Sequence, residues 1–434
     1  MNPTSSLREL LRSEIESKFL SFAAFAEKAG IHRSRFSLFF HRNTPKAMPF
    51  DQLIKITNAL NHPKDHFFYF YIDECFHGSK VSRSRLMPLL SECVELNRQD
   101  CIENILFRLD FDIRAHHLQI VLDVSEQFLH SSKRNHAKPL FQWIVKNAYN
   151  LKAERAAVAY YGLFLTSISS NDNDKNFRLA LEFEQVHCWL PEHYLLDGYL
   201  QLTNIYFNLA KWSEMEFYAD RLRELVERMY ANKCIKEFFP TERHPVVYYG
   251  QGYLQKGNAL EHQGKYSEAE LYIEGYQDLS WFPNLDKLGW EEVRKFSHWA
   301  RANRFNLAIL KGNTSVLKDY SFFLEQHPYE VLPSLLTILE SANRYGFSID
   351  SLLTKLMPLI FTKDKNNYYG ELFNLNRLAA LYYQIANYHA KRGRQTLASK
   401  FSMQALMVSE GLNNTRHFRE LASLSAACSY DDHL

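Results

Sequence analysis

Four asparagines of this chain stand at one repeated spacing. Each lies six residues before a small residue that is suited to a tight turn: Ala210, Gly264, Gly312 and Gly393. The asparagines are Asn204, Asn258, Asn306 and Asn387. An asparagine amide offers two donors and an acceptor, so it can pair with the N–H and the C=O of an extended peptide together. Asparagine is only a middling helix former, so propensity does not account for four copies inside helical patterns.

Other polar side chains share the same predicted face. The predicted peptide-binding residues are Asn204, Asn208, Gln251, Asn258, His262, Arg301, Asn303, Asn306, Tyr383 and Asn387. An arginine in this set could bind a carboxylate with two hydrogen bonds. The alternative is that the asparagines form hydrogen bonds between helices inside the fold.

The segment that carries Asn258 is the clearest copy of a helical hairpin. In YLQKGNALEHQGKYSEAELYIEGY, Gly257 is the small residue where two helices touch and Gly264 opens the turn. Tyr266 fills the gap between the helices, and Ala269 lets the second helix pack closely. This pattern resembles a tetratricopeptide unit, which stacks into a right-handed α-solenoid. Gly (15) and Pro (13) are sparse, which also favours an all-α fold.

The N-terminal segment predicts five short helices between residues 6 and 76. FAEKAGIHRSRFSLFFHRNTPKAMPFDQLIKITNAL resembles the helix-turn-helix of phage repressors of the Cro/C1 type. Ala26 is the small residue four before the turn glycine, Gly30, and Ile31 is the apolar residue after it. Phe36 and Phe39 supply the inner face of the recognition helix.

The outer face of that helix predicts DNA binding. Its candidate DNA-binding residues are His32, Arg33, Ser34, Arg35, Ser37, His41 and Arg42. Arginine can donate two hydrogen bonds to guanine, and serine can donate a hydrogen bond to a phosphate. His32 departs from the usual Ser or Thr N-cap, which predicts a weaker cap. The alternative is a solvated basic helix in a domain used only for dimerisation.

Composition and motif content exclude several classes. The chain has 434 residues and a net charge of +2, of which residues 1–66 carry +4 and the remainder −2. Its six cysteines form no CxxC pair, and there is no signal-peptide pattern and no apolar run of membrane-spanning length. No motif for hydrolysis, nucleotide binding or a zinc protease is present. We therefore expect a cytoplasmic protein with no enzymatic activity, no cofactor, no metal and no membrane partner.

The combination predicts a helix-turn-helix domain at 1–76, a linker at 77–85 and a tetratricopeptide-like domain at 86–434 for peptide binding and dimerisation. It resembles the peptide-pheromone receptors of Gram-positive bacteria and their phages: Rap, Rgg, NprR, PlcR, PrgX and, nearest, the arbitrium receptors. The resemblance implies a homodimeric transcriptional regulator on double-stranded DNA, controlled by a short signalling peptide in quorum sensing. The alternative is a scaffold for a protein partner, such as a Rap-like phosphatase or response-regulator inhibitor, with a vestigial helix-turn-helix.

Overall fold

The computed structural model describes residues 6–19, 21–41, 45–77, 80–169, 172–231, 241–361 and 371–410. Apart from the two-residue strands β1 (Phe76–His77) and β2 (Lys80–Val81), which pair antiparallel, the regular elements of these residues are helices. The all-α prediction is therefore confirmed.

The contacts divide the chain into two compact units, Met1–Ser167 and Ile168–Leu434. The first unit holds α1 (Leu7–Lys18), α2 (Phe22–Lys28), α3 (Arg33–Phe39), α4 (Phe50–Ala59), α5 (Phe68–Cys75), α6 (Arg83–Glu95), α7 (Gln99–Leu109), α8 (Ala115–Gln127), α9 (Lys138–Lys146) and α10 (Ala153–Ser167), with the 3₁₀ turns η1 (Arg134–Ala137) and η2 (Ala148–Asn150). The predicted domain boundary at residue 76 lies inside this unit, where α6 packs on α5 and α4.

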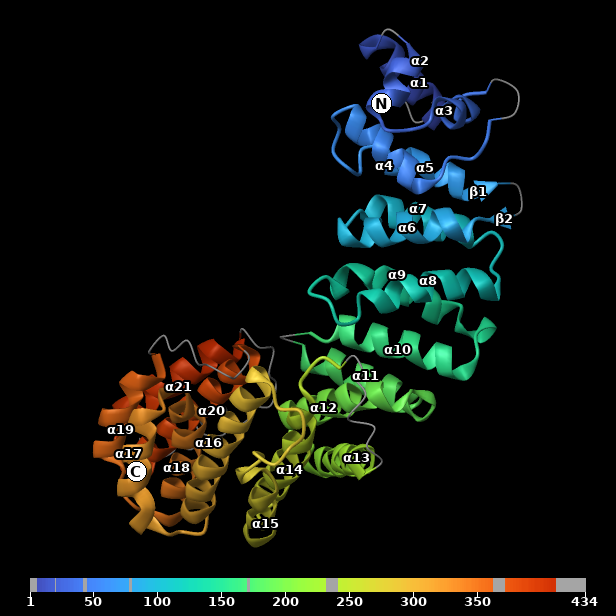
Figure 1. Ribbon diagram of the computed structural model, residues 1–434. Coiled ribbons are helices and arrows are strands. Elements are labelled where there is room, and N and C mark those ends of the chain that lie inside the picture. The colour runs from blue at the N-terminus through green and yellow to red at the C-terminus, as the bar shows by residue number, and fades with distance from the viewer. Residues whose placement is uncertain are drawn as a thin grey trace. The chain divides into compact units, whose positions relative to one another are not determined.

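The second unit consists of helices joined by short connections (Figure 1). Its helices are α11 (Asn173–Glu184), α12 (Glu192–Asn208), α13 (Trp212–Ala231), α14 (Pro245–His262), α15 (Tyr266–Gln277), α16 (Lys287–Leu310), α17 (Leu317–Gln326), α18 (Val331–Tyr345), α19 (Asp350–Leu356), α20 (Glu371–Ala390) and α21 (Gln395–Glu410). Short 3₁₀ turns lie between them: η3 (His187–Trp189), η5 (Thr314–Val316), η6 (Pro328–Glu330) and η7 (Met357–Phe361).

Five of these helices pack side by side in chain order: α12 on α14, α14 on α16, α16 on α18 and α18 on α20. We call α12, α14, α16, α18 and α20 the A-layer. Most of its helices form a hairpin with the helix that follows, as α12 does with α13, α14 with α15 and α20 with α21. The hairpins predicted from the asparagine spacing are therefore present.

The four predicted turn residues share one backbone conformation. Ala210, Gly264, Gly312 and Gly393 have φ values of 53°, 78°, 86° and 67°. At each, the next residue donates its N–H to the carbonyl five residues back, as Lys265 does to Leu260 over 2.9 Å. This is the Schellman end of a helix, in which a left-handed residue lets the last carbonyls be satisfied. It places the four asparagines at equivalent positions.

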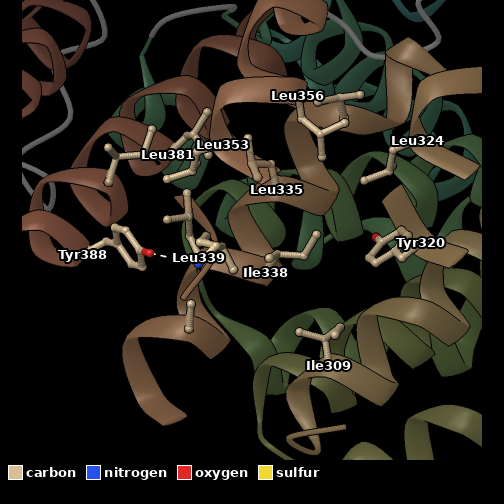
Figure 2. Close-up of a cluster of buried hydrophobic side chains, with 14 of the residues drawn as sticks. Ile309, Tyr320, Leu324, Leu335, Ile338, Leu339, Leu353, Leu356, Leu381 and Tyr388 are labelled. Carbon is tan, nitrogen blue, oxygen red and sulfur yellow. Dashed lines mark hydrogen bonds between the residues drawn. The ribbon is translucent and has the colours of Figure 1, made fainter. Parts of the chain in front are cut away.

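A continuous apolar core fills the C-terminal half of the second unit (Figure 2). Leu335, Ile338 and Leu339 of α18 lie at its centre, and side chains of α16, α17, α19, α20 and α21 pack on them. The phenol of Tyr388 on α20 accepts a hydrogen bond from the backbone N–H of Ile349 over 2.9 Å. The core therefore joins side chains that range from Ala302 on α16 to Ala405 on α21.

Gly257 lies where α14 contacts α15, as the sequence predicts, but this contact would also accept alanine. A Cβ there would meet only the carbonyl oxygen of Ala269 at 3.5 Å and the Cβ of Tyr272 at 3.6 Å, which is ordinary contact. Seven residues earlier on α14, a Cβ on Gly250 would lie 2.5 Å from the ring of Phe296. The ring of Phe296 on α16 therefore requires glycine at position 250.

The two glycines of α14 predict opposite results for the same substitution. Gly250→Ala should destabilise the second unit by about 1–3 kcal/mol, because the methyl group overpacks against Phe296. Gly257→Ala should be neutral or stabilising by up to about 1 kcal/mol, because alanine is the better helix former. Urea unfolding followed by circular dichroism measures both, and equal destabilisation by the two variants would contradict this packing.

Candidate functional site

The candidate DNA-binding side chains lie on one exposed surface at α3. His32, Arg33, Ser34, Arg35, Ser37 and His41 are all exposed, and Arg42 lies outside the described residues. Arg33 contacts Glu27 at 3.3 Å, and with both side chains mostly in solvent this pair contributes little to stability. The guanidinium of Arg33 is therefore free to exchange that partner for another anion.

Buried phenylalanine rings anchor the inner face of α3. Phe36 and Phe39 are 1% and 3% exposed, which confirms them as the inner face of the helix. The ring of Phe36 lies 5.6 Å from that of Phe25 on α2 and 5.0 Å from that of Phe40. Ile31 is buried in the turn between the two helices, and Gly30 has a φ of 62° there. Apolar packing thus orients the polar residues of α3 outward.

Two arginines of α1 hold the C-terminal end of α3. Arg8 donates to the carbonyl of Phe39 over 2.9 Å, and Arg12 donates to that of Phe40 over 2.9 Å. Arg8 also pairs with the carboxylate of Glu74 on α5 at 2.6 Å. Glu74 is 2% exposed and accepts the backbone N–H of Met48 over 3.0 Å. The carbonyls at a helix end have no partner in the helix itself, so these bonds fix where α3 stops.

The start of α3 is less firmly held, as the sequence predicted. The side chain of His32 caps no backbone N–H; its Nδ1 instead lies 2.7 Å from the hydroxyl of Ser34. The first amides of α3 therefore lack a side-chain cap.

Two of the predicted peptide-binding asparagines are engaged within the fold. Asn306 is 7% exposed, accepts the phenol of Tyr320 over 2.6 Å and donates to the side chain of Asn303 over 3.4 Å. Asn303 in turn donates to the phenol of Tyr276 over 2.9 Å. For this pair, the alternative of hydrogen bonds between helices describes the structure.

The remaining three asparagines of the series are half-buried on the A-layer. Asn204 accepts a long hydrogen bond of 3.5 Å from Gln255, whose amide also donates to Gln251 over 3.0 Å. Asn258 and Asn387 have partly accessible side chains. These amides, together with half-buried Asn208 next to them on α12, keep hydrogen-bonding capacity for a ligand.

The other three predicted residues lie in different surroundings. His262 is exposed and stacks on Trp212 with ring centroids 4.1 Å apart. Arg301 is exposed, and its guanidinium lies over the ring of Phe323 at 5.0 Å. It therefore contacts α17, which is not a helix of the A-layer. Tyr383 packs against the core around Leu335.

Glu340 on α18 was not predicted from the sequence. It lies six residues before Gly346, whose φ is 79°, so it occupies the position that asparagine holds in the other hairpins. Loss of hydration, together with the charge of Glu340, raises the pKa of Glu261 on α14 to about 8. The spacing of Glu340 to Gly346 is a signal present in the sequence, but the residue type differs from the asparagine of the other hairpins.

The first and last helices of the A-layer approach each other. The guanidinium of Arg377 on α20 lies 5.9 Å from the ring centroid of Phe207 on α12. Arg344 of α18 donates to the phenol of Tyr266 on α15 over 2.6 Å. These contacts join helices that are not neighbours in chain order. Residues from several hairpins therefore lie near one another in the second unit.

Asp197 of α12 links that helix to α14 from a buried position. It is 1% exposed, accepts the phenol of Tyr248 and accepts the backbone N–H of Glu242 at 3.3 Å. Loss of hydration raises the pKa of its carboxyl to about 6, despite the hydrogen bond from Tyr248. Asp197 is thus a structural residue of the A-layer.

No family model, no curated protein and no solved structure matches this chain. Within the described ranges, no helix is long and apolar enough to cross a membrane.

Asp197 predicts a pH dependence of stability. Its pKa is raised in the folded state, so its contribution to stability is present below about pH 4 and is lost as the pH rises through about 6. Asp197→Asn should therefore be less destabilising at pH 7 than at pH 5, or more stabilising. The measurement is the thermal midpoint of the variant minus that of wild type at each pH.

Asp350 provides a control of opposite sign. Its exposed ion pair with Arg394, at 2.7 Å, lowers the pKa of its carboxyl. Its contribution is present at neutral pH and is lost as the pH falls through the lowered pKa. Asp350→Asn should therefore cost more at pH 7 than at low pH. The same pH trend in both variants would rule out the assignment for Asp197.

Proposed function

We propose that this chain is a DNA-binding regulator whose affinity for DNA is set by a short peptide bound on the A-layer. In this proposal residues up to α5 act as a helix-turn-helix domain with α3 as the recognition helix. The hairpins of the second unit act as a tetratricopeptide-like solenoid, and the protein works as a cytoplasmic homodimer. The family of peptide-pheromone receptors, near the arbitrium type, is the class of protein with this combination.

The observation that carries the DNA-binding half is the surface of α3. Its polar residues are exposed while two rings on the opposite face are buried and two arginines hold its end. A recognition helix needs such an anchored inner face and an outer face of donors for base edges and phosphates. A solvated basic helix that only supports dimerisation needs no such surface.

The peptide-binding half is supported by the equivalent asparagines at the Schellman ends. Asn204, Asn258 and Asn387 stand at one position of three A-layer helices, and their amides are half-buried. We therefore propose an extended peptide as the ligand, bound by these amides through its backbone N–H and C=O groups.

A scaffold for a protein partner is the second candidate. It is favoured by the engagement of Asn303 and Asn306 within the fold, which removes two of the six predicted asparagines from ligand binding. The two candidates differ in what α3 does, since a scaffold needs no DNA contact.

The DNA-binding proposal is tested on duplexes selected from a randomised library with the wild-type protein. The double variant Arg33→Ala, Arg35→Ala should bind the selected duplex at least about 30-fold more weakly, since each base contact contributes about 1–3 kcal/mol. The control is Arg83→Ala on α6, an exposed arginine paired with Asp123 at 2.7 Å in the same unit, which should change affinity little. Wild-type affinity in the double variant would overturn the assignment of α3.

The peptide-binding proposal is tested with short peptides isolated on the wild-type protein from a display library. Asn258→Ala should weaken the best peptide about tenfold or more in calorimetry, which corresponds to about 1.4 kcal/mol for a lost amide pair. Asn104→Ala, a half-buried asparagine of the first unit that accepts from Arg108 over 2.9 Å, serves as the control. Equal loss in both variants, or none in Asn258→Ala, would contradict the amide clamp.

A further inference from the structure

Three side chains of the first unit gather atoms that commonly bind transition metals. Glu14 of α1 and His62 and His66, which lie between α4 and α5, each offer one ligand atom, and these three atoms lie within 4.8 Å of one another. Nε2 of His62 lies 2.6 Å from a carboxylate oxygen of Glu14. The imidazoles of His62 and His66 stack at 4.0 Å with their planes 4° apart.

The backbone places the two histidines firmly. Asn61 has a φ of 58° and ends α4, and the N–H of His62 donates to the carbonyl of Thr57 over 3.2 Å. His66 follows one turn later and donates its N–H to Pro63 over 3.0 Å. The buried ring of Phe67 meets both imidazoles edge-on, at 5.5 Å and 4.6 Å. The sequence contained this H-x₃-H spacing, but the acidic partner on α1 is 48 residues away.

His66 is the member whose chemistry the fold leaves unexplained. Within the described part of the chain its Nε2 is buried and has no hydrogen-bond partner. A neutral imidazole nitrogen without a hydrogen-bond partner can offer its lone pair to a metal.

We propose that Glu14, His62 and His66 form a binding site for a divalent ion of the zinc type, with water at the fourth position. Two imidazole nitrogens and one carboxylate oxygen are a common tripod for Zn²⁺. Tetrahedral bonds of about 2.0–2.2 Å bring ligand atoms to about 3.4 Å from one another. The half-buried side chains thus contract from at most 4.8 Å, and the ion replaces the hydrogen bond between His62 and Glu14.

Such an ion would join α1 to the connection between α4 and α5. The same helix carries Arg8 and Arg12, which hold the end of α3. Lys18 is the competing cation, since its ammonium lies 3.2 Å from the same oxygen of Glu14 that contacts His62. With a side chain that is 45% exposed, Lys18 can turn into solvent when the ion binds.

The site is tested with the full chain, stripped of metal by a chelator and titrated with zinc chloride against a chromophoric competitor. Wild type should bind one Zn²⁺ at this site with a dissociation constant in the micromolar range or below. His66→Ala and Glu14→Gln should each weaken it at least tenfold. His116→Ala serves as the control, because it breaks another histidine pair of the same unit, whose ring centroids are 4.0 Å apart. Zinc affinity unchanged in His66→Ala and Glu14→Gln, or none in wild type, would overturn the proposal.

Two further measurements distinguish the loss of a zinc ligand from misfolding of the variants. Lys18→Met should bind zinc more tightly than wild type, because the competing ammonium is gone, and a misfolded variant would not gain affinity. Cobalt added in place of zinc should give visible bands of nitrogen and oxygen ligands without thiolate charge-transfer bands. Thiolate bands that persist in His66→Ala would instead assign the ion to cysteine and contradict the site.

Discussion

The ion pair between Arg8 and Glu74 is the constraint on which the placement of α3 depends. Glu74 is nearly fully buried, so its charge must be compensated, and Arg8 does this while donating to the last carbonyl of α3. Removing one partner of such a pair leaves a buried charge and typically costs about 3–5 kcal/mol. One interaction therefore links α1, α3 and α5. It fixes the position of α3 and so that of the exposed arginines on it.

The second unit depends on a repeated helix end. A left-handed residue ends each of the five A-layer helices, four of them in the same hydrogen-bonding pattern, so the residues six positions earlier are equivalent along the helices. What occupies that position differs: half-buried asparagine in three helices, an asparagine bonded to Tyr320 in α16, and Glu340 in α18. The same position therefore carries either a side chain bonded within the fold or one that stays partly accessible.

Local signals in the sequence predicted the local features well. Gly30, Gly264 and the buried face of Phe36 and Phe39 follow from spacing alone, because turn chemistry and apolar period act over a few residues. Contacts between distant residues were not predictable in this way. No pattern near Asn306 reveals the phenol of Tyr320, and the clash that makes Gly250 necessary comes from Phe296 on another helix.

The proposed function requires that a ligand on the A-layer alters the DNA affinity of α3. A ligand changes DNA affinity only if it binds one conformation of the protein better than another. The direct measurement is the dissociation constant for the selected duplex with and without a saturating selected peptide, at fixed salt. The account predicts a change of at least about fivefold, in either direction. Equal constants with and without peptide would contradict it.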